Sequence, residues 1–168
     1  MAGALIVTAE LGPADLSWLD RLRREHYPLD RNQVRAHLTM FHSLPPSAEA
    51  EVRTRLAVLA RQSPPKASLQ GLMDLGGGVA IRVVSSGLDR MRDELAGGLH
   101  GLLGPQDAGG WRPHITIQNK VAPKLARALI AAMEREFRPR RLEIGGFGLH
   151  RYLGGPWETI AVYPLRGR

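Results

Sequence analysis

The stretch RAHLTMFHSLP (residues 35–45) contains His37 and Thr39, a histidine and a threonine separated by one apolar residue. The tetrapeptide HITI (residues 114–117) repeats this pair later in the chain, again with apolar residues at its second and fourth positions. A single copy is typical of a β-strand that carries a buried histidine. Six histidines and five threonines in 168 residues give about 0.2 chance matches, so two matched copies favour a functional site.

Both copies are expected to be β-strands, in which alternate side chains share a face. His37, Thr39 and Phe41 then point one way from the first strand, and His114 and Thr116 point one way from the second. The apolar residues between them face the core. The sequence therefore predicts two His–Thr faces that meet in a central cleft.

Two facing imidazoles suit acid–base catalysis without a metal, because one can accept a proton while the other donates one near neutral pH. The hydroxyls of Thr39 and Thr116 lie one strand step away, where they are suited to hydrogen-bond the free oxygens of a phosphate. The sequence therefore indicates His37 and His114 as a catalytic pair.

Five further residues, beside the motifs or in the closing strands, are candidate substrate contacts. Arg112 and Lys120 would add positive charge at the cleft, and Phe41, Trp111 and Tyr152 would stack on a base. Core packing or an ordinary surface position is the alternative for each of them.

The other four histidines are interpreted as structural. His42 falls on the face opposite His37 if the strand alternates regularly, and His26, His100 and His150 have no partner at useful spacing. No histidine pair has the helical spacing or the nearby carboxylates of a zinc site, so no metal is expected. The glycine clusters match neither the P-loop pattern Gly-x-x-x-x-Gly-Lys-Ser/Thr nor the dinucleotide-binding pattern Gly-x-Gly-x-x-Gly, so no cofactor is expected. A Gly-x-Ser-x-Gly elbow of a serine hydrolase does not occur.

Strand and helix patterns alternate twice along the chain, which predicts an α+β fold. Apolar periodicity predicts helices over about 14–26, 47–62 and 87–103 and a fourth from residue 123. Ser47 and Ser86 are the expected caps of the second and third helices. Strands are expected at residues 4–11, 37–41, 67–75, 79–85, 114–117, 141–152 and 158–165. The Gly/Pro-rich segment 104–110 is expected to be a loop.

Each half of the pattern contains one His-x-Thr strand, a following helix and a strand pair. We therefore expect one domain over residues 1–168, with half-repeats at about 4–78 and 79–168. Its expected shape is bilobal, with pseudo-twofold symmetric antiparallel sheets, helices outside and a central cleft.

The amino-acid composition limits the classes of function that the chain can have. The chain is 43% hydrophobic and lacks cysteine, which excludes disulfides, thiolate metal sites and cysteine nucleophiles. No signal peptide and no run of about 20 apolar residues is seen, so a cytoplasmic monomer without membrane contact is expected. The net charge of +7 suggests an anionic partner, with nucleic acid first. The alternative is that the positive charge reflects genomic base composition and not a binding surface, since the basic residues are mostly arginine and are scattered along the chain.

The segments HLTM, RPHIT and HITI resemble the paired His-x-Thr-x signatures of the two-histidine phosphoesterases, in particular the 2′-5′ RNA ligase and RNA 2′,3′-cyclic phosphodiesterase branch. The resemblance covers nearly the whole chain. It implies that His37 and His114 are catalytic and that Thr39 and Thr116 bind phosphate. The sequence departs from the RNA-acting branch after the second motif, where QNKV replaces an arginine-containing continuation.

These observations lead to a metal-independent phosphoesterase that hydrolyses a 2′,3′-cyclic phosphodiester, on an RNA end or a nucleotide, to a 2′-phosphate. The resemblance implies that His114 activates water and His37 protonates the departing 3′ oxygen. One alternative is ATP-independent 2′-5′ RNA ligation, or hydrolysis of a small cyclic nucleotide or an ADP-ribose derivative. An alternative of another class is a non-catalytic RNA-binding module.

Overall fold

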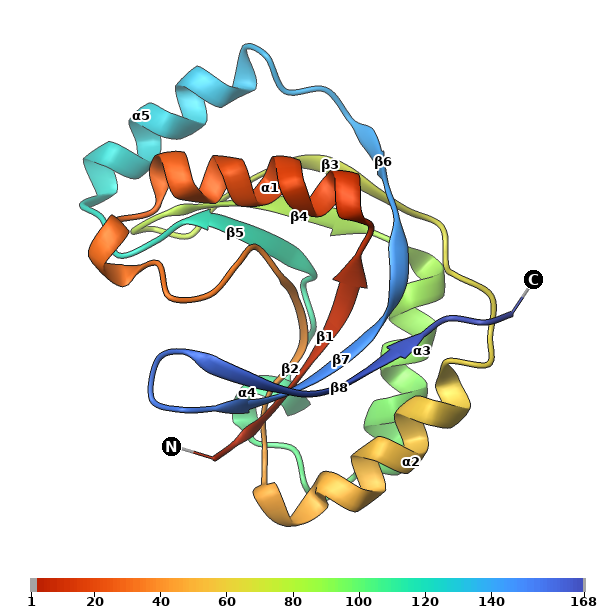
Figure 1. Ribbon diagram of the computed structural model, residues 1–168. Coiled ribbons are helices and arrows are strands. Elements are labelled where there is room, and N and C mark those ends of the chain that lie inside the picture. Colours follow the sequence, from red (N-terminus) through yellow and green to blue (C-terminus); the bar gives the residue numbers. More distant parts are fainter. Residues whose placement is uncertain (1–2, 168) are drawn as a thin grey trace.

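The computed structural model describes residues 3–167, which form one curled eight-stranded sheet with helices around it (Figure 1). The strand order is β6-β3-β4-β5-β2-β1-β7-β8, and every neighbouring pair is antiparallel. The strands are β1 Leu5–Leu11, β2 Leu38–Leu44, β3 Ala67–Asp74, β4 Val79–Val84, β5 His114–Gln118, β6 Arg140–Leu142, β7 Ile144–Tyr152 and β8 Trp157–Pro164. The helices are α1 Pro13–His26, α2 Glu49–Leu59, α3 Ser86–Gly98, α4 Pro105–Ala108 and α5 Pro123–Glu134, with 3-10 turns at Leu29–Arg31 and Pro46–Ala48. The expected α+β class is confirmed.

The order strand, helix, strand, helix, strand runs through β1 to β3 and again through β4 to β7, with α4 and β6 added in the second round. In each round the third strand crosses over, so that β3 lies beside β4 and β7 lies beside β1. One lobe therefore holds β6, β3, β4 and β5, and the other holds β2, β1, β7 and β8 (Figure 1). Each lobe takes strands from both of the half-repeats expected at about 4–78 and 79–168.

The two His-x-Thr strands join the lobes. β2 and β5 are neighbours in the sheet but share a single register pair, Leu38 opposite Ile115. Beyond this pair the backbone groups of β2 on the β5 side are left without a partner strand. The sheet is therefore interrupted at its centre, between the two motifs.

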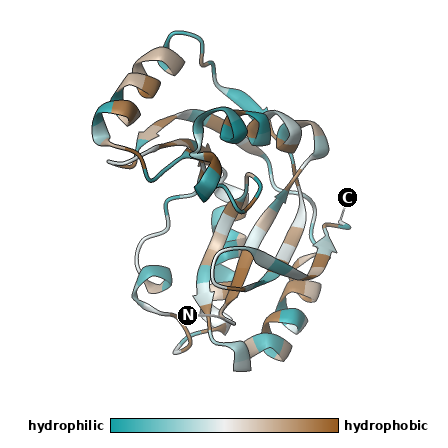
Figure 2. Cartoon of the chain, turned by 60° about the vertical axis from the view of Figure 1, so that its left-hand side comes forward, coloured by the Kyte–Doolittle hydropathy of each residue, from teal (hydrophilic) through white to brown (hydrophobic). Residues whose placement is uncertain are grey.

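Helices cover both lobes. α1 packs on β5, and α5 packs on β3 and β4, while α2 and α3 pack on each other. Figure 2 shows brown hydrophobic residues recurring along the strands, and teal hydrophilic positions on the helices. Both motif strands bury their intervening residues, because Leu38, Met40, Ile115 and Ile117 are all inaccessible to solvent. No helix within residues 3–167 is long and apolar enough to cross a membrane.

The predicted helix caps differ from those observed by one position. The cap of α3 is Ser85, whose Oγ accepts a hydrogen bond from the Leu88 amide at 3.1 Å, so the expected cap Ser86 is wrong. Ser47 is not a cap either, because Pro46–Ala48 form a 3-10 turn and Ala48 precedes α2. α2 and α3 also end earlier than expected, and the expected loop 104–110 contains the short helix α4.

A bulge in β2 changes which side chains face the cleft. Val7 of β1 lies opposite Phe41, while the next residue, Thr8, lies opposite Thr39, so Met40 is an extra residue in β2. An extra residue reverses the alternation that follows it. Phe41 therefore points into the core, where it is fully buried, and His42 turns to the side of Thr39. The predicted shared face of His37 and Phe41, and the predicted opposite face for His42, are both wrong for this reason.

Candidate active site

A cleft of about 370 Å³ lies at the centre of the molecule, where β2 and β5 part. All four motif residues line it, so the structure brings His37, Thr39, His114 and Thr116 together as expected. The other residues used below that line the same cleft are His42, Arg92, Asp107, Trp111, Arg112 and Trp157.

The register of β2 and β5 sets the arrangement of the two motifs. Leu38 pairs with Ile115 in an antiparallel sense. One residue to either side of this pair, His37 lies across from Thr116, and Thr39 lies across from His114. A phosphate bound between the strands would therefore have one imidazole and one hydroxyl on each side.

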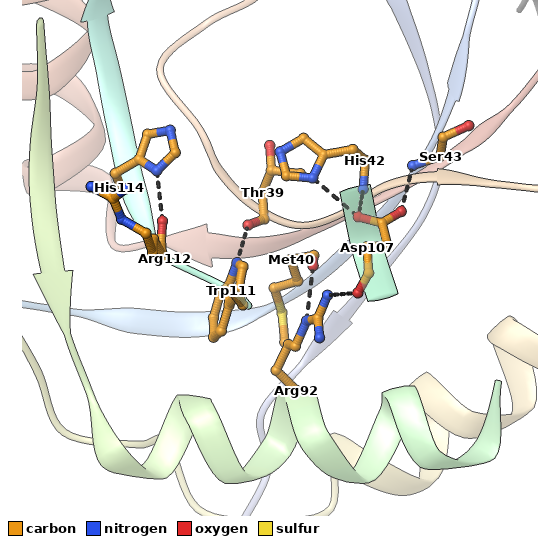
Figure 3. Close-up of polar contacts among 9 residues, drawn as sticks. All are labelled: Thr39, Met40, His42, Ser43, Arg92, Asp107, Trp111, Arg112 and His114. Carbon is orange, nitrogen blue, oxygen red and sulfur yellow. Dashed lines mark hydrogen bonds and ion pairs between the residues drawn. The ribbon is translucent and has the colours of Figure 1, made fainter. Parts of the chain in front are cut away.

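Each motif histidine makes the same backbone hydrogen bond. Nδ1 of His37 donates to the carbonyl of Arg35, and Nδ1 of His114 donates to the carbonyl of Arg112, both at 2.7 Å. A carbonyl only accepts, so the proton of each neutral ring is fixed on Nδ1. Nε2 is then the nitrogen of each ring that is available to the substrate. Figure 3 shows this bond at His114.

The two histidines differ in their surroundings. The ring of His37 packs against Trp157 of β8, with ring centroids 4.5 Å apart. Removal from water lowers the pKa of His37 to about 4; the bond to the Arg35 carbonyl opposes this shift, and the charge of Arg23 adds to it. In the free protein His37 is therefore a neutral base at pH 7.

Side chains replace the missing partner strand along the open edge of β2. The indole Nε1 of Trp111 donates to the Thr39 carbonyl at 3.1 Å. The guanidinium of Arg92 donates to the carbonyls of Met40, at 3.3 Å, and of Asp107, at 2.6 Å. Arg92 comes from α3 and is only 7% exposed, and burial lowers its pKa. The edge beside the cleft is thus held by groups from α3 and from the α3–β5 connection.

A second buried arginine makes the equivalent contact on β5. Arg23 of α1 donates to the Thr116 carbonyl at 3.1 Å and to Oδ1 of Asn32 at 2.7 Å, and its guanidinium lies over the Tyr27 ring. α1 follows β1 as α3 follows β4, so Arg23 and Arg92 occupy corresponding positions in the two rounds. Each holds the motif strand of the other round.

His42 is paired with a buried carboxylate. Oδ1 of Asp107, in α4, accepts hydrogen bonds from the His42 amide at 2.8 Å and from His42 Nδ1 at 3.1 Å, and Oδ2 accepts from the Ser43 amide at 3.0 Å (Figure 3). Burial raises the pKa of Asp107, but these hydrogen bonds outweigh it and hold the pKa below its ordinary value. Asp107 is therefore a carboxylate, and it fixes the His42 ring.

His150 lies behind Trp157, in a chain of hydrogen bonds. Nδ1 is 3.1 Å from Oγ1 of Thr159, Nε2 is 2.9 Å from Oγ1 of Thr8, and Thr8 donates to Glu10 at 3.0 Å. The ring is buried, and burial lowers its pKa. The structural interpretation of His150 is therefore consistent with this geometry, and the ring supports Trp157 at a centroid distance of 5.4 Å.

The five weaker candidates divide into two groups. Trp111 and Arg112 line the cleft. Phe41 is in the core, Lys120 lies in the exposed turn after β5 with a φ of 61°, and Tyr152 is at the end of β7, so these three do not line it.

Sequence reasoning missed several residues of the cleft, including Arg92, Trp157, His42 and Asp107. Trp157 has a local signal, since it directly follows a Gly-Gly-Pro turn and begins a strand. His42 and Asp107 have none, because the bulge and the short helix that place them are not visible in the residue pattern.

The residues that the structure describes contain no group of three or more His, Asp or Glu side chains that could hold a metal ion. The chemistry that the cleft itself offers is proton transfer by imidazoles and hydrogen bonding to an anion.

Comparisons with solved structures identify the fold. The protein TT0787 of Thermus thermophilus matches with a TM-score of 0.70 at 21% identity, covering 98% of this chain and 99% of that chain. E. coli LigT complexed with NADP+ matches with a TM-score of 0.64 at 16% identity, covering 99% of both chains. A protein described as a phosphoesterase matches with a TM-score of 0.61 at 16% identity, covering 98% of this chain and 99% of that chain. At these identities the likeness shows a shared fold.

Comparison with curated proteins gives no match. The profile of the 2′-5′ RNA ligase superfamily, in contrast, matches residues 12–156 and so includes both His-x-Thr motifs. Because this match spans most of the chain, the chain belongs to the 2′-5′ RNA ligase superfamily and is an enzyme of the type found in that superfamily.

Proposed function

We propose that the chain hydrolyses a 2′,3′-cyclic phosphodiester, at an RNA end or on a nucleotide, to a 2′-phosphate without a metal ion. The observation that carries this proposal is the pair of motif histidines in one cleft, each with Nδ1 bonded to a backbone carbonyl. Two imidazoles with free Nε2 atoms cover both proton transfers of the reaction.

In the proposed reaction His114 Nε2 takes a proton from water as the water oxygen attacks phosphorus. The bond from phosphorus to the 3′ oxygen breaks, and His37 donates a proton to that oxygen. Thr39 and Thr116 hold the two free phosphate oxygens, so that attack and departure lie in line. The products are a 3′ hydroxyl and a 2′-phosphate. These roles follow the family resemblance.

The low pKa of His37 adds a condition to this mechanism. An acid at pH 7 must carry a proton, and His37 in the free protein does not. A bound cyclic phosphate places a negative charge beside the ring, which favours the protonated form. We therefore assign the protonation of His37 to the substrate complex. That E. coli LigT has been solved with 3′-AMP supports a nucleotide as the ligand.

The test uses an RNA oligomer ending in a 2′,3′-cyclic phosphate, incubated with the protein in excess EDTA and without ATP. We expect a 2′-phosphate product, identified by mass and by its resistance to a 3′-phosphatase. A 3′-phosphate alone would reverse the roles of the two histidines. Activity abolished by EDTA would contradict the metal-free mechanism, and joining to a second RNA with a 5′ hydroxyl would identify a ligase.

A further inference from the structure

The third histidine of the cleft has no role in the two-histidine reaction. His42 lies on β2, three residues after Thr39, and the extra residue Met40 turns it to the same side as that threonine. Its side chain is 35% exposed, and His42 and Thr39 line the same cleft (Figure 3).

Asp107 determines which nitrogen of His42 faces the cleft. Its carboxylate is 2% exposed and accepts Nδ1–H of the ring, as well as the amides of His42 and Ser43. The two amide bonds account for Asp107 as a replacement for the missing partner strand. These amide bonds do not explain why the His42 ring also bonds to Asp107, since the ring could instead point to solvent. With Nδ1 committed to Asp107, Nε2 is the ring atom left for a ligand.

The charges around the cleft suit an anion. Among the described residues that line it, Asp107 is the sole carboxylate, and its two oxygens already accept three hydrogen bonds. The remaining polar lining consists of imidazole, guanidinium, hydroxyl, amide and indole groups. A histidine held by a buried carboxylate in such a cleft can donate from Nε2 to a phosphate oxygen when it is protonated.

We propose that His42 is a third substrate-contacting imidazole, which binds an oxygen of the phosphate through Nε2, and that Asp107 is the positioning residue that orients it. The identity of the ligand as a phosphate rests on the proposed function. His42 is then an anchor for the anion, separate from the acid and base.

Two substitutions distinguish a role of His42 in binding phosphate from a role in holding Asp107. The amide nitrogen of His42→Asn takes the place of Nδ1 and can still donate to Asp107, but it has no group at the position of Nε2. The longer side chain of His42→Gln places its amide nitrogen near the position of Nε2. All variants keep the backbone bond from residue 42 to Asp107, so we expect them to fold, as checked by circular dichroism and thermal unfolding.

The probes are inorganic phosphate and adenosine 2′-phosphate, titrated against the whole chain by calorimetry or NMR. We expect His42→Ala and His42→Asn to weaken both affinities by about 10-fold or more, as for loss of a hydrogen bond to a charged group. His42→Gln should retain more affinity than His42→Asn, and His100→Ala, at an exposed position outside the cleft, should match the wild type. Turnover by His42→Asn should show a raised KM, with a smaller loss of kcat than His114→Ala.

Wild-type affinity in His42→Asn would mean that the ring serves Asp107 alone and would overturn the proposal, as would unchanged affinity in His42→Ala. The titrations do not depend on turnover. If the protein binds phosphate through His42 but hydrolyses no cyclic phosphate, the proposed function is wrong and the role of His42 in binding still holds. If the protein hydrolyses a cyclic phosphate but its affinities do not depend on His42, the proposed function holds and the role of His42 is wrong.

Discussion

His37 and His114 share a motif and the same kind of backbone hydrogen bond, yet the surroundings of the two rings differ. The Trp157 ring covers His37, and the pKa of His37 is held near 4. Covering an imidazole disfavours its charged form, since the ring loses hydration that only the cation needs strongly. The aromatic cover of His37 therefore comes from β8 and lies outside the motif sequences.

The pH dependence of kcat/KM should reflect this cover. The reaction needs one neutral imidazole as its base, so activity falls when both imidazoles of the free enzyme are protonated. We expect the acidic limb at about pH 4, with activity lost as the pH drops below it, whichever histidine is the acid. Trp157→Ala, which exposes the His37 ring, should move this limb upward toward the ordinary imidazole value of about 6.5. Trp157→Phe should move it less, and a limb unchanged in Trp157→Ala would contradict desolvation as the cause.

Removal of either motif imidazole tests the catalytic pair. His37→Ala and His114→Ala should each lower kcat by at least about 10²-fold, because positioned acid–base catalysis contributes about 10²–10⁴. Neither side chain belongs to the hydrophobic core, so the variants should keep their thermal midpoints. Initial rates on the cyclic phosphate substrate measure the effect. Wild-type turnover by folded His114→Ala would contradict the two-histidine mechanism.

β2 shows what the residue pattern can predict and what it cannot. The His-x-Thr repeat was sufficient to predict both motif strands, the cleft and the four residues on its walls, because regular alternation holds from His37 to Thr39. It fails one residue later, at Met40, where the bulge arises from pairing with β1 and with the α3–β5 connection. These are contacts between distant segments, and no local pattern encodes them. Phe41 and His42 were therefore assigned to each other's faces.

Arg92 is the residue that holds this edge together, so we expect its loss to be costly. Arg92→Met keeps the apolar stem but removes the hydrogen bonds to the carbonyls of Met40 and Asp107. Two hydrogen bonds from a charged group predict a loss of about 2–4 kcal/mol in the free energy of unfolding, measured by urea denaturation. Arg90→Met, on the exposed side of the same helix, is the matched control and should be nearly neutral. Equal stability of the two variants would mean that the hydrogen bonds of Arg92 do not stabilise the open edge of β2.

The molecule as a whole places its site where two lobes exchange strands. β3 and β7 each cross to the other lobe, and Arg23 and Arg92 each hold the motif strand of the other round. Each lobe is therefore built from strands of both rounds. The two motif strands meet at the single pair of Leu38 and Ile115, so the cleft that they line lies at the junction of the lobes.

Binding of RNA should depend on the charge of the whole surface as well as on the cleft. A net charge of +7 would let an oligomer contact basic residues beyond the site, and each phosphate neutralised releases counterions. For an RNA oligomer ending in a cyclic phosphate, we expect the logarithm of the affinity to fall linearly with the logarithm of salt, by about 0.7 per phosphate contacted. A mononucleotide 2′,3′-cyclic phosphate offers a single phosphate and should show a slope of about 0.7 or less. Fluorescence anisotropy or calorimetry over about 50 to 200 mM salt compares the two ligands. Equal slopes would mean that the basic surface takes no part in binding, and that the substrate is a small cyclic phosphate recognised within the cleft alone.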